Sequence, residues 1–500
     1  FFNRQAKIRW AKQQAIPEIQ RLLGDDKYTE AFDLMEEAGK YVSKDPRWVE
    51  LLPKVESFVS IKTTPAGADL YIYNEIDGDW EYKGQSPVDK ARTSQGYKRW
   101  KIEKEGFETL EGAIGTRAGS VASLNVKLDK EDSLPSGMIR IPGREFSPHL
   151  VGLDHLEAQQ TPEYLIDKYE VTNKEFKRFI DSGGYEKKTF WKHPFMKDGS
   201  RLSWEEAMDE FKDKIGMAGP ATWEMSDYPE GQDDYPVTGV SWYEAAAYAE
   251  FADKSLPTVY HWDNAADVRQ IRHIVSVSNF NGSAPSPVGS HQSITSYGTY
   301  DMAGNVREWC WNENENRRYI LGGGWDEPIY MFNYAVSQPP FDRSPYNGFR
   351  CVKYLKQDEN LDALKASIKL PFRDFMKEEP VSDEIFNVYL SLYAYDKTEL
   401  NGSIDSVDNR AEDFIKQKVS FDAAYGDERV SAYLFLPKGI RPPYQAVVYY
   451  PGGATINRRS SETLESLSFR HYDFFVKSGR AVIFPIYKST YERGDEIETD

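Results

Sequence analysis

The feature that most constrains this chain is the stretch YGTYDMAGNVREW, residues 297–309, in which two acids flank a tight turn. The acids are Asp301 and Glu308, and Gly304 and Asn305 form the turn between them. Calcium takes oxygen ligands from carboxylates and from backbone carbonyls, so a turn of this kind can direct several ligands at one ion. Asp, Gly and Asn are also the residues of ordinary turns. The stretch therefore predicts either a loop that wraps a cation or a hydrogen-bonded turn.

Four further motifs surround this loop in a fixed order: YLIDKYEVTNKEFKRFIDSGGY, YPVTGVSWYEAAAYAEFADKSLPTVYHWDNAA, ILGGGWDEP and GFRC. Together they resemble the formylglycine-generating enzyme family, also called the sulfatase-modifying factor domain, over residues 135–355. The resemblance implies a C-type-lectin-like α+β fold with little regular secondary structure, in which calcium holds long loops together. It implies one structural calcium ion, bound by the side chains of Asp301 and Glu308 and the carbonyls of Gly304 and Val306. The family's second calcium loop would fall at residues 278–287, which carry no acid here.

The resemblance also locates the family's catalytic metal. Its enzymes bind copper(I) through two cysteines just after the GGW motif, because soft sulfur ligands select that ion. Aligned on this motif, the two positions fall at or near Glu327 and Phe332, so we expect no copper and no formylglycine-generating activity. Cys351 matches a structural cysteine of the family whose partner position is Ala249 here. Cys310 could replace that partner, or the two cysteines could be unrelated buried thiols.

Two other features of the central region have weaker implications. The seven histidines lack the H-x-x-x-H-x-E spacing of the related sulfoxide synthases, which use an iron site, and His261 is expected to be a packed structural residue. Residues 190–234 form an acidic and aromatic insert. We expect this insert to be exposed, either as a specificity loop or as a solvated surface excursion.

The first 134 residues contain two patterns. From Ile16 to Val55 apolar residues recur at helical spacing, with GDD as a break and Pro46 opening a short helix, which predicts a helical segment over residues 1–57. The pattern resembles a single tetratricopeptide-type unit, which would act as a helical stalk or pack on its neighbour. Residues 58–134 alternate apolar and polar positions between Pro and Gly turns, which predicts short antiparallel strands. Their motifs PAGA, GQSP and EKEGFE resemble the PEGA domain, a small β-sandwich of bacterial surface and envelope proteins. We find no catalytic constellation in this part and expect a spacer or binding module.

After a polar connector, residues 356–413, the pattern changes again. The pattern of residues 414–500 predicts a hairpin, a strand that runs into glycines, a helix and a second strand. This order of elements resembles the start of an α/β-hydrolase sheet. In that family, a loop such as the one at Gly452 and Gly453 contributes a backbone N–H to the oxyanion hole. The alternative is an ordinary turn between a strand and a helix. A G-x-S-x-G nucleophile motif is missing from the sequence, so a hydrolase would need a catalytic triad beyond residue 500.

The predicted architecture is thus multidomain α+β: a helical stalk, a PEGA-like sandwich, a sulfatase-modifying-factor domain and a partial α/β-hydrolase sheet. A net charge of −18 excludes a nucleic-acid partner, because phosphate binding needs clustered basic residues. No apolar run reaches the roughly 20 residues of a membrane helix. The start, FFNRQAKIRW, is similar to the exit end of a membrane span that would precede residue 1, a weak indication.

Three functions are compatible with this architecture. The leading interpretation is an extracytoplasmic, membrane-anchored envelope protein that binds a small molecule, glycan or peptide. Its domain order resembles the periplasmic part of certain bacterial membrane serine/threonine kinases, although kinase motifs are missing from the sequence. The alternative is an esterase or peptidase of the α/β-hydrolase kind. Residual oxidation of cysteine is a third possibility, for which a pair of metal-binding thiols cannot be placed.

Overall fold

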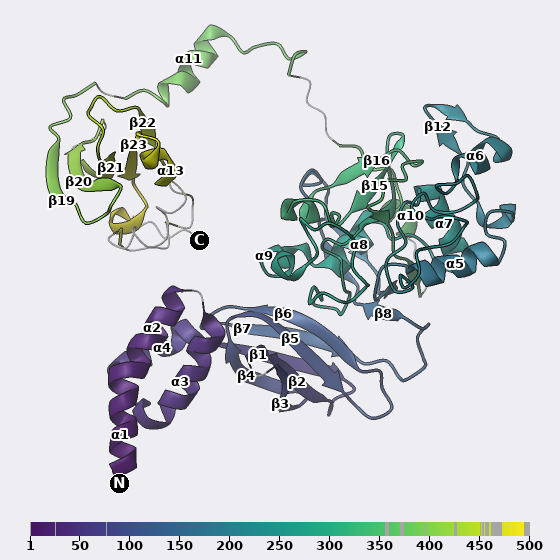
Figure 1. The fold of residues 1–500 in the computed structure, drawn as a ribbon, viewed down its shortest axis with the longest axis horizontal. Coiled ribbons are helices and arrows are strands. Elements are labelled where there is room, and N and C mark those ends of the chain that lie inside the picture. Colours follow the sequence, from purple (N-terminus) through teal and green to yellow (C-terminus); the bar gives the residue numbers. More distant parts are fainter. Residues whose placement is uncertain are drawn as a thin grey trace. The chain divides into compact units, whose positions relative to one another are not determined.

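The computed structural model of the chain describes residues 2–25, 27–76, 78–355, 360–370, 375–395, 397–424, 428–450, 452, 455, 460–461 and 473–494. These residues form two compact units, residues 1–372 and residues 373–500. The first unit contains a helical part, a β-sandwich and a larger mixed part (Figure 1). The predicted mixture of helices and sheets in several domains is therefore confirmed.

The chain begins with helices that pack around a core of their own. Their bounds are α1 Phe2–Trp10, a π-helical segment Ala11–Ala15, α2 Ile16–Gly24, α3 Tyr28–Val42 and α4 Pro46–Val55. Pro46 stands in the first turn of α4, where its missing N–H costs nothing, and Asp45 caps that helix by accepting from the Arg47 N–H at 3.1 Å. Helix thus begins at Phe2, within the predicted helical segment of residues 1–57, and Ala11 and Ala15 pack in the helical core. None of the described helices is long and apolar enough to cross a membrane.

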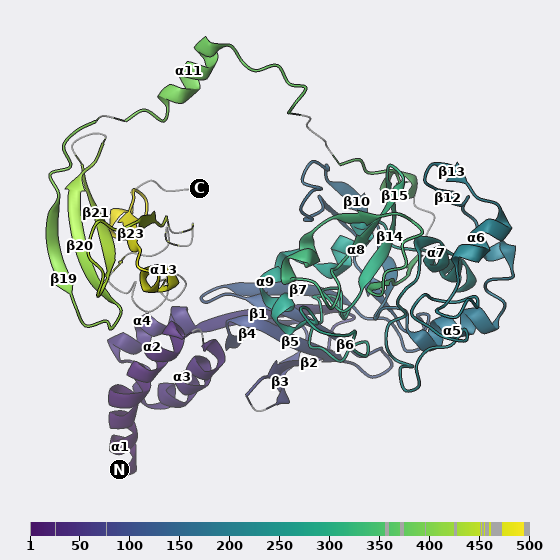
Figure 2. The same ribbon diagram turned by 45° about the horizontal axis from the view of Figure 1, so that its top comes forward.

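The next part is the predicted β-sandwich. One sheet has the order β4-β1-β7 and the other β3-β2-β5-β6. Alternate residues of these strands enclose a small core around Trp100, Ile61 and Leu70. The two sheets are visible in Figure 2. The strands are β1 Glu56–Thr64, β2 Asp69–Asn74, β3 Asp79–Gln85, β4 Val88–Ser94, β5 Gly96–Glu103, β6 Leu110–Thr116 and β7 Val121–Lys127.

The central part combines short strands and helices with long loops. The loop between residues 278 and 306 has no strand or helix among its described residues. Two aromatic-rich core clusters support this part, one around Trp262 and the other around Trp242. Its main elements are β8 Met138–Ile141, β9 Arg144–Phe146, β10 Gln159–Thr161, β11 Tyr164–Asp167, α5 Asn173–Asp181, α6 Trp204–Glu210, α7 Trp242–Phe251, α8 Val259–Ala266, α9 Ile271–Ile274, β14 Arg307–Asn314, β15 Arg317–Leu321, β16 Val336–Gln338, β17 Asn347–Gly348 and β18 Val352–Tyr354.

The insert of residues 190–234 differs from the exposed loop that we expected. Its aromatic residues Phe195, Phe211 and Trp223 are buried in the core cluster around Trp242. Arg343 fixes it from outside by donating to three main-chain carbonyls of the insert while pairing with the buried Glu244. The aromatic content of the insert therefore serves packing, whereas its acidic residues are exposed, apart from the buried Asp213.

The central part also extends past residue 355. Leu364, in α10 Leu361–Leu364, is fully buried, and Ile368 is almost so, both in the cluster around Trp262. Asn312 donates to the carbonyls of Leu364 and Ala366 at 2.7 and 2.9 Å. The beginning of the predicted connector is thus part of the first compact unit, which runs to residue 372.

The β-sandwich is docked onto the central part through β5 and β6. The Ala113 N–H donates to the Thr295 carbonyl at 3.0 Å, and the Tyr300 hydroxyl donates to Glu111 at 3.2 Å. Gly298 has φ +96°, and a Cβ there would lie 2.5 Å from the Glu111 carbonyl oxygen. This close approach requires glycine. The sandwich therefore contacts residues 293–300, directly before the loop of Asp301 and Glu308.

The second unit is built on a five-stranded sheet of order β19-β20-β21-β23-β22. The predicted hairpin is β20 with β21, and β22, α13 and β23 form a strand–helix–strand unit in which the two strands are parallel neighbours. An exposed helix, α11, precedes the sheet. The bounds are α11 Asp383–Ser391, β19 Ser403–Asp408, β20 Phe414–Asp422, β21 Arg429–Pro437, β22 Ala446–Val448, α13 Asp473–Lys477 and β23 Ala481–Ile486.

Candidate functional site

The loop that the sequence singles out ends in a buried ion pair. Glu308 in β14 and Arg350, just before β18, are both completely buried. Arg350 donates from Nη2 to Oε1 of Glu308 at 2.6 Å and from Nε to Oε2 at 2.7 Å, in the forked geometry of a strong guanidinium–carboxylate pair. Trp262 adds a hydrogen bond from Nε1 to Oε2 at 2.8 Å. Both oxygens of Glu308 are thus bound by protein donors.

Arg350 is satisfied on its other sides by the main chain. It donates to the carbonyls of Asp167, Lys168 and Tyr300 at 3.1, 3.2 and 2.8 Å. Burial by itself would lower the pKa of Arg350, but the neighbouring charge of Glu308 outweighs it and the pKa lies above its ordinary value. The guanidinium therefore stays charged and joins β11, β14 and the loop between them.

Two more buried acids lie near this pair. Asp301 accepts from the Gly289 N–H at 2.6 Å and from the Ser293 hydroxyl at 2.9 Å. Glu170 accepts from the Asn305 amide at 3.2 Å. Burial raises the pKa of Asp301, and it raises the pKa of Glu170 far above the ordinary value, with the charge of Asp301 adding to the effect. The site thus holds three buried carboxyl groups beside a single guanidinium.

The predicted turn is present, and the carboxylates on either side of it are held by protein donors. Gly304 and Asn305 have φ +79° and +59°, and a Cβ on Gly304 would lie 2.4 Å from the Asn279 carbonyl oxygen. The oxygens of Asp301 and Glu308 are occupied by separate sets of protein donors. Among the described residues, no group of three or more His, Cys, Asp or Glu side chains could hold a metal ion. Both carboxylates are bound by protein donors in this structure, and calcium at Asp301, Gly304, Val306 and Glu308 stays a prediction.

The two positions that hold copper cysteines in the related family have other roles here. Glu327 forms a two-pronged ion pair with Arg307, with Nε to Oε2 at 2.6 Å, and accepts from the Gly324 N–H at 2.8 Å. Phe332 is completely buried in the core cluster around Trp262. One position is therefore part of a salt bridge and the other is part of the hydrophobic core.

The two cysteines are free and do not pair. Cys310 belongs to the core cluster around Trp262, whereas Cys351 belongs to the cluster around Trp242 together with Ala249. Burial raises the pKa of both thiols well above the ordinary value, which keeps them protonated and unreactive. Of the two alternatives for these cysteines, unrelated buried thiols are thus the one observed.

His261 is packed as expected. It is completely buried, its Nδ1 lies 2.6 Å from the Thr258 hydroxyl, and burial lowers its pKa to about 3. The imidazole is therefore neutral at any physiological pH.

The predicted oxyanion loop is only partly visible. The carbonyl of Gly452 accepts from the Thr455 hydroxyl at 2.9 Å, whereas Gly453 lies outside the described residues. The preceding strand β22 is half-exposed, and Val448 is 48% accessible. The sequence predicts a continuous apolar strand here. The exposure arises because β22 lies at an edge of the described sheet.

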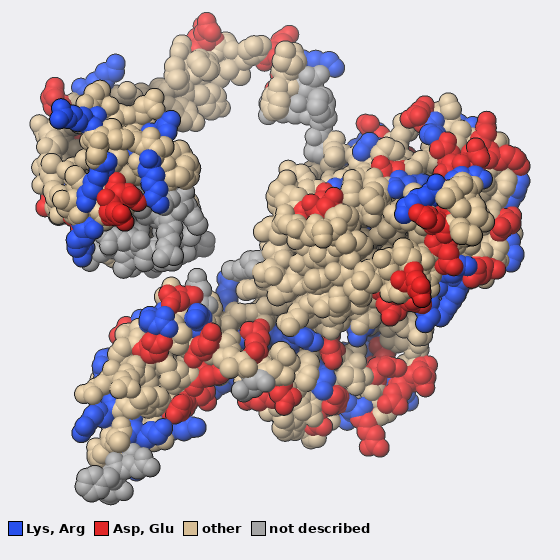
Figure 3. All heavy atoms as spheres, in the orientation of Figure 1, with Lys and Arg blue, Asp and Glu red and all other residues tan. Residues whose placement is uncertain are grey.

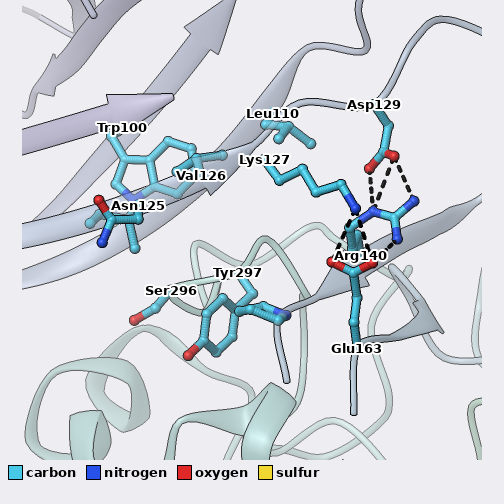
Figure 4. A pocket seen from close by; sticks show the side chains of 12 residues that line it. Trp100, Leu110, Asn125, Val126, Lys127, Asp129, Arg140, Glu163, Ser296 and Tyr297 are labelled. Carbon is cyan, nitrogen blue, oxygen red and sulfur yellow. Dashed lines mark hydrogen bonds and ion pairs between the residues drawn. The ribbon is translucent and has the colours of Figure 1, made fainter. Parts of the chain in front are cut away.

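A cavity of about 100 Å³ lies at the junction between the β-sandwich and the central part (Figure 4). Trp100, Leu110, Leu124, Val126, Pro142 and Tyr297 provide its apolar walls. An ion network closes one side, in which Arg140 binds Asp129 at 2.6 Å and Glu163 at 2.6 Å, and Lys127 reaches Glu163 at 3.1 Å. These residues come from regions that lie far apart in the sequence.

Sequence reasoning missed three parts of these sites. Arg350 stands inside the GFRC motif, which we interpreted only through its cysteine. Glu170 stands in DKYEVT, directly before the apolar residue Val171, and a charged residue at such a position gives no sign that it is buried. The junction cavity has no local sequence signal, because its walls are assembled from both domains.

Comparison with known proteins identifies the two domains. Residues 125–355 match the sulfatase-modifying factor enzyme 1-like domain, and residues 56–132 match the PEGA domain. The chain therefore contains both domains that its motifs resemble. A third domain, of the α/β-hydrolase kind, is not identified in this way.

Several curated proteins share part of the sequence. Serine/threonine-protein kinase pkn1 of Chlamydia pneumoniae is 30% identical over 291 residues, which covers 50% of this chain and 44% of the kinase. Hercynine oxygenase of Mycolicibacterium smegmatis is 27% identical, covering 41% of this chain and 53% of the enzyme. Formylglycine-generating enzyme of Thermomonospora curvata is 27% identical, covering 44% of this chain and 94% of the enzyme. The chain thus matches less than half the length of the kinase.

Among solved structures, CarF aligns with a TM-score of 0.32 and 20% identity, covering 44% of this chain and 99% of that protein. A TM-score at this level carries no argument about fold or function.

Proposed function

We propose that this chain is the ligand-binding part of a bacterial envelope protein, in which the sulfatase-modifying-factor domain binds a partner and does not oxidise cysteine. The observation that carries the proposal is the ion pair of Glu327 with Arg307 at a position where the related enzymes have a copper cysteine. A carboxylate that is held by a guanidinium offers no soft ligand for copper(I). Phe332, at the second position, is enclosed in the core.

The similarity to pkn1 kinases supports a role in signalling. By this analogy, the chain is an extracytoplasmic sensor that is anchored to the membrane outside the described residues. Such an inference from domain order is an analogy and needs its own test. The ligand is a small molecule, glycan or peptide. Nucleic acid does not suit a net charge of −18, and on the face shown in Figure 3 basic side chains are interspersed with acidic ones.

The proposal is tested by measuring oxidation and binding on the same protein. The chain is incubated with copper(I), oxygen and a sulfatase peptide that contains cysteine, and mass spectrometry follows conversion of the cysteine to formylglycine. We expect unmodified peptide and no stoichiometric copper. In parallel, the chain is applied to a glycan array, a peptide display library and a small-molecule array, where we expect saturable binding of one class. Formation of formylglycine, or failure of all three binding screens, would overturn the proposal.

A second candidate function is hydrolysis by the C-terminal unit. It is favoured by the parallel pairing of β22 and β23 across α13, because a strand–helix–strand unit of this kind is the building block of α/β enzymes. Gly452 and Gly453 would then lie in the oxyanion loop. The measurement is labelling of the full-length protein with a fluorophosphonate, a reagent for activated serines. If no serine is labelled, hydrolysis is excluded.

A further inference from the structure

The junction cavity contains a buried donor without a partner. Trp100, in β5, is 2% exposed, and its Nε1–H has no acceptor among the described residues. An indole N–H that is removed from water without an acceptor is costly and is usually satisfied in folded proteins. Trp100 lines the cavity, so a ligand that brings an oxygen atom there would offset this cost.

A row of main-chain groups borders the same cavity. Within the described sheets, β7 has β1 as its only neighbour, and the two strands are parallel without a break in register. The ladder starts with Phe58 N–H bonded to the Ser120 carbonyl and ends with Leu128 N–H bonded to the Thr64 carbonyl. Because alternate residues of a parallel strand bond to the same neighbour, the even-numbered residues of β7 face β1. The N–H and C=O groups of Asn125 and Lys127, which line the cavity, therefore face away from the sheet.

These two features together select the chemistry of the ligand. Outward N–H and C=O groups that repeat every second residue along an exposed edge match the main chain of an extended peptide. The cavity volume of about 100 Å³ is smaller than the roughly 150 Å³ of a cavity that holds a benzene molecule, so the cavity suits a short aliphatic side chain better than an aromatic ring. The charged groups at the rim are already paired with one another, so the site gives no preference for a charged ligand.

We propose that an extended peptide segment binds along the free edge of β7 and places one short aliphatic side chain in the cavity below Trp100. The main-chain hydrogen bonds supply affinity and the cavity supplies specificity, as in other cases of strand addition. An oxygen of the peptide accepts from Trp100 Nε1. This inference rests on the proposed binding function, since it specifies the class of ligand. The cysteine-oxidation assay tests the loss of catalysis on its own. The proposed loss of catalysis and the proposed peptide site on β7 can therefore fail independently.

The experiment uses a display library of random linear nonapeptides, selected on the purified 500-residue chain. Selected peptides are then measured by fluorescence anisotropy against three variants. Asn125→Pro removes an outward N–H while leaving the ladder to β1 intact, because residue 125 does not bond to β1. Val121→Pro is the matched control, since it changes the same edge outside the cavity. Trp100→Phe removes the indole donor and keeps an aromatic side chain.

We expect binding to weaken at least tenfold in Asn125→Pro and severalfold in Trp100→Phe, and to weaken less in Val121→Pro than in Asn125→Pro. Methylation of alternate peptide amides should also weaken binding at least tenfold. This measurement uses the wild-type protein, so it does not depend on whether a variant folds. Hydrogen exchange at Asn125 and Lys127 should slow when the peptide is added. Three outcomes would overturn the proposal: selected peptides that bind Asn125→Pro as well as the wild type, a library without enriched peptides, and a dimer that Asn125→Pro abolishes. The last would identify a second copy of this chain as the partner of β7.

Discussion

Arg350 is the residue on which the buried charge of the central domain depends. Replacing it with methionine removes the guanidinium but retains a long apolar side chain, and it leaves Glu308 buried without a counter-charge. Breaking a buried pair from one side costs about 3–5 kcal/mol. We expect Arg350→Met to lower the free energy of unfolding by about that amount in urea denaturation. The double variant Arg350→Met/Glu308→Gln should recover part of the loss, and equal losses in the two proteins would contradict a role in charge balance.

Glu170 should make stability depend on pH. Its pKa is raised by burial and by the charge of Asp301, so the folded state binds a proton more tightly than the unfolded state. Stability should therefore be highest below the ordinary glutamate pKa and should fall as the pH rises through the higher pKa of the folded state. Thermal unfolding between pH 4 and pH 8 measures this slope. We expect Glu170→Gln to flatten the slope, and an unchanged profile would show that Glu170 is not its source.

These two residues show what a single sequence reveals at this scale. The acids at Asp301 and Glu308 could be found because they flank a recognisable turn. Arg350 and Glu170 could not, because a charged residue in a sequence gives no sign of burial, and burial of charge is the exception for Arg and Glu. Only the fold brings Arg350 within hydrogen-bonding distance of Glu308.

At the scale of the loop, the structure makes a prediction about calcium. The carboxylate of Asp301 is already bound by Gly289 and Ser293. The carboxylate of Glu308 is already bound by Arg350 and Trp262. The protein thus supplies both carboxylates with hydrogen bonds and supplies Glu308 with a counter-charge. If these bonds take the place of an ion, the melting temperature should be the same in excess chelator and in millimolar calcium. A calcium ion that binds in this loop would instead stabilise the protein by roughly 2.7 kcal/mol when the free calcium concentration is about 100 times the dissociation constant. A calcium-dependent shift that disappears in Asp301→Ala would restore the calcium site that the sequence resemblance implies.

Elements with a clear period could be predicted, and those fixed by tertiary contacts could not. Alternation of period two correctly indicated the sandwich, and Pro46 correctly marked the start of α4. The basic residues at the start of the chain suggested the flank of a membrane span, and the packing of Ala11 and Ala15 in the helical core was not foreseen. The insert of residues 190–234 was expected to be exposed, yet its aromatic residues fill a core formed with distant elements.

At the scale of the whole chain, the least predictable feature is the docking of the PEGA domain on the central domain. The hydrogen bond from Ala113 to Thr295 joins residues that are far apart in sequence, and no local pattern marks either end. The junction is therefore held by a hydrogen bond between the two domains and by an ion pair between residues on either side of the linker. Asp129 and Arg140 are bonded across the segment of residues 130–137, which the composition alone would suggest is an open linker.

This organisation predicts where a protease first cuts the folded chain. The segment of residues 375–395 has exposed side chains throughout, including Met376 at 94% and Tyr393 at 81%, and it follows the end of the first compact unit. Residues 130–137 are held by the pair of Asp129 and Arg140, and residues 361–368 are held by the burial of Leu364 and Ile368. Proteolysis requires a segment that can open locally, and local opening is cheapest where few contacts must break.

We therefore expect subtilisin, which has broad specificity, to cut first between residues 375 and 395 and to leave a resistant fragment of about the first 372 residues. Mass spectrometry of the early products locates the cut. Arg140→Ala provides a matched variant, because loss of its bonds to Asp129 and Glu163 should make residues 130–137 a second early site. A first cut in residues 130–137 or 361–368 of the wild-type protein would show that these segments behave as open linkers and that the junction does not hold the PEGA domain in place.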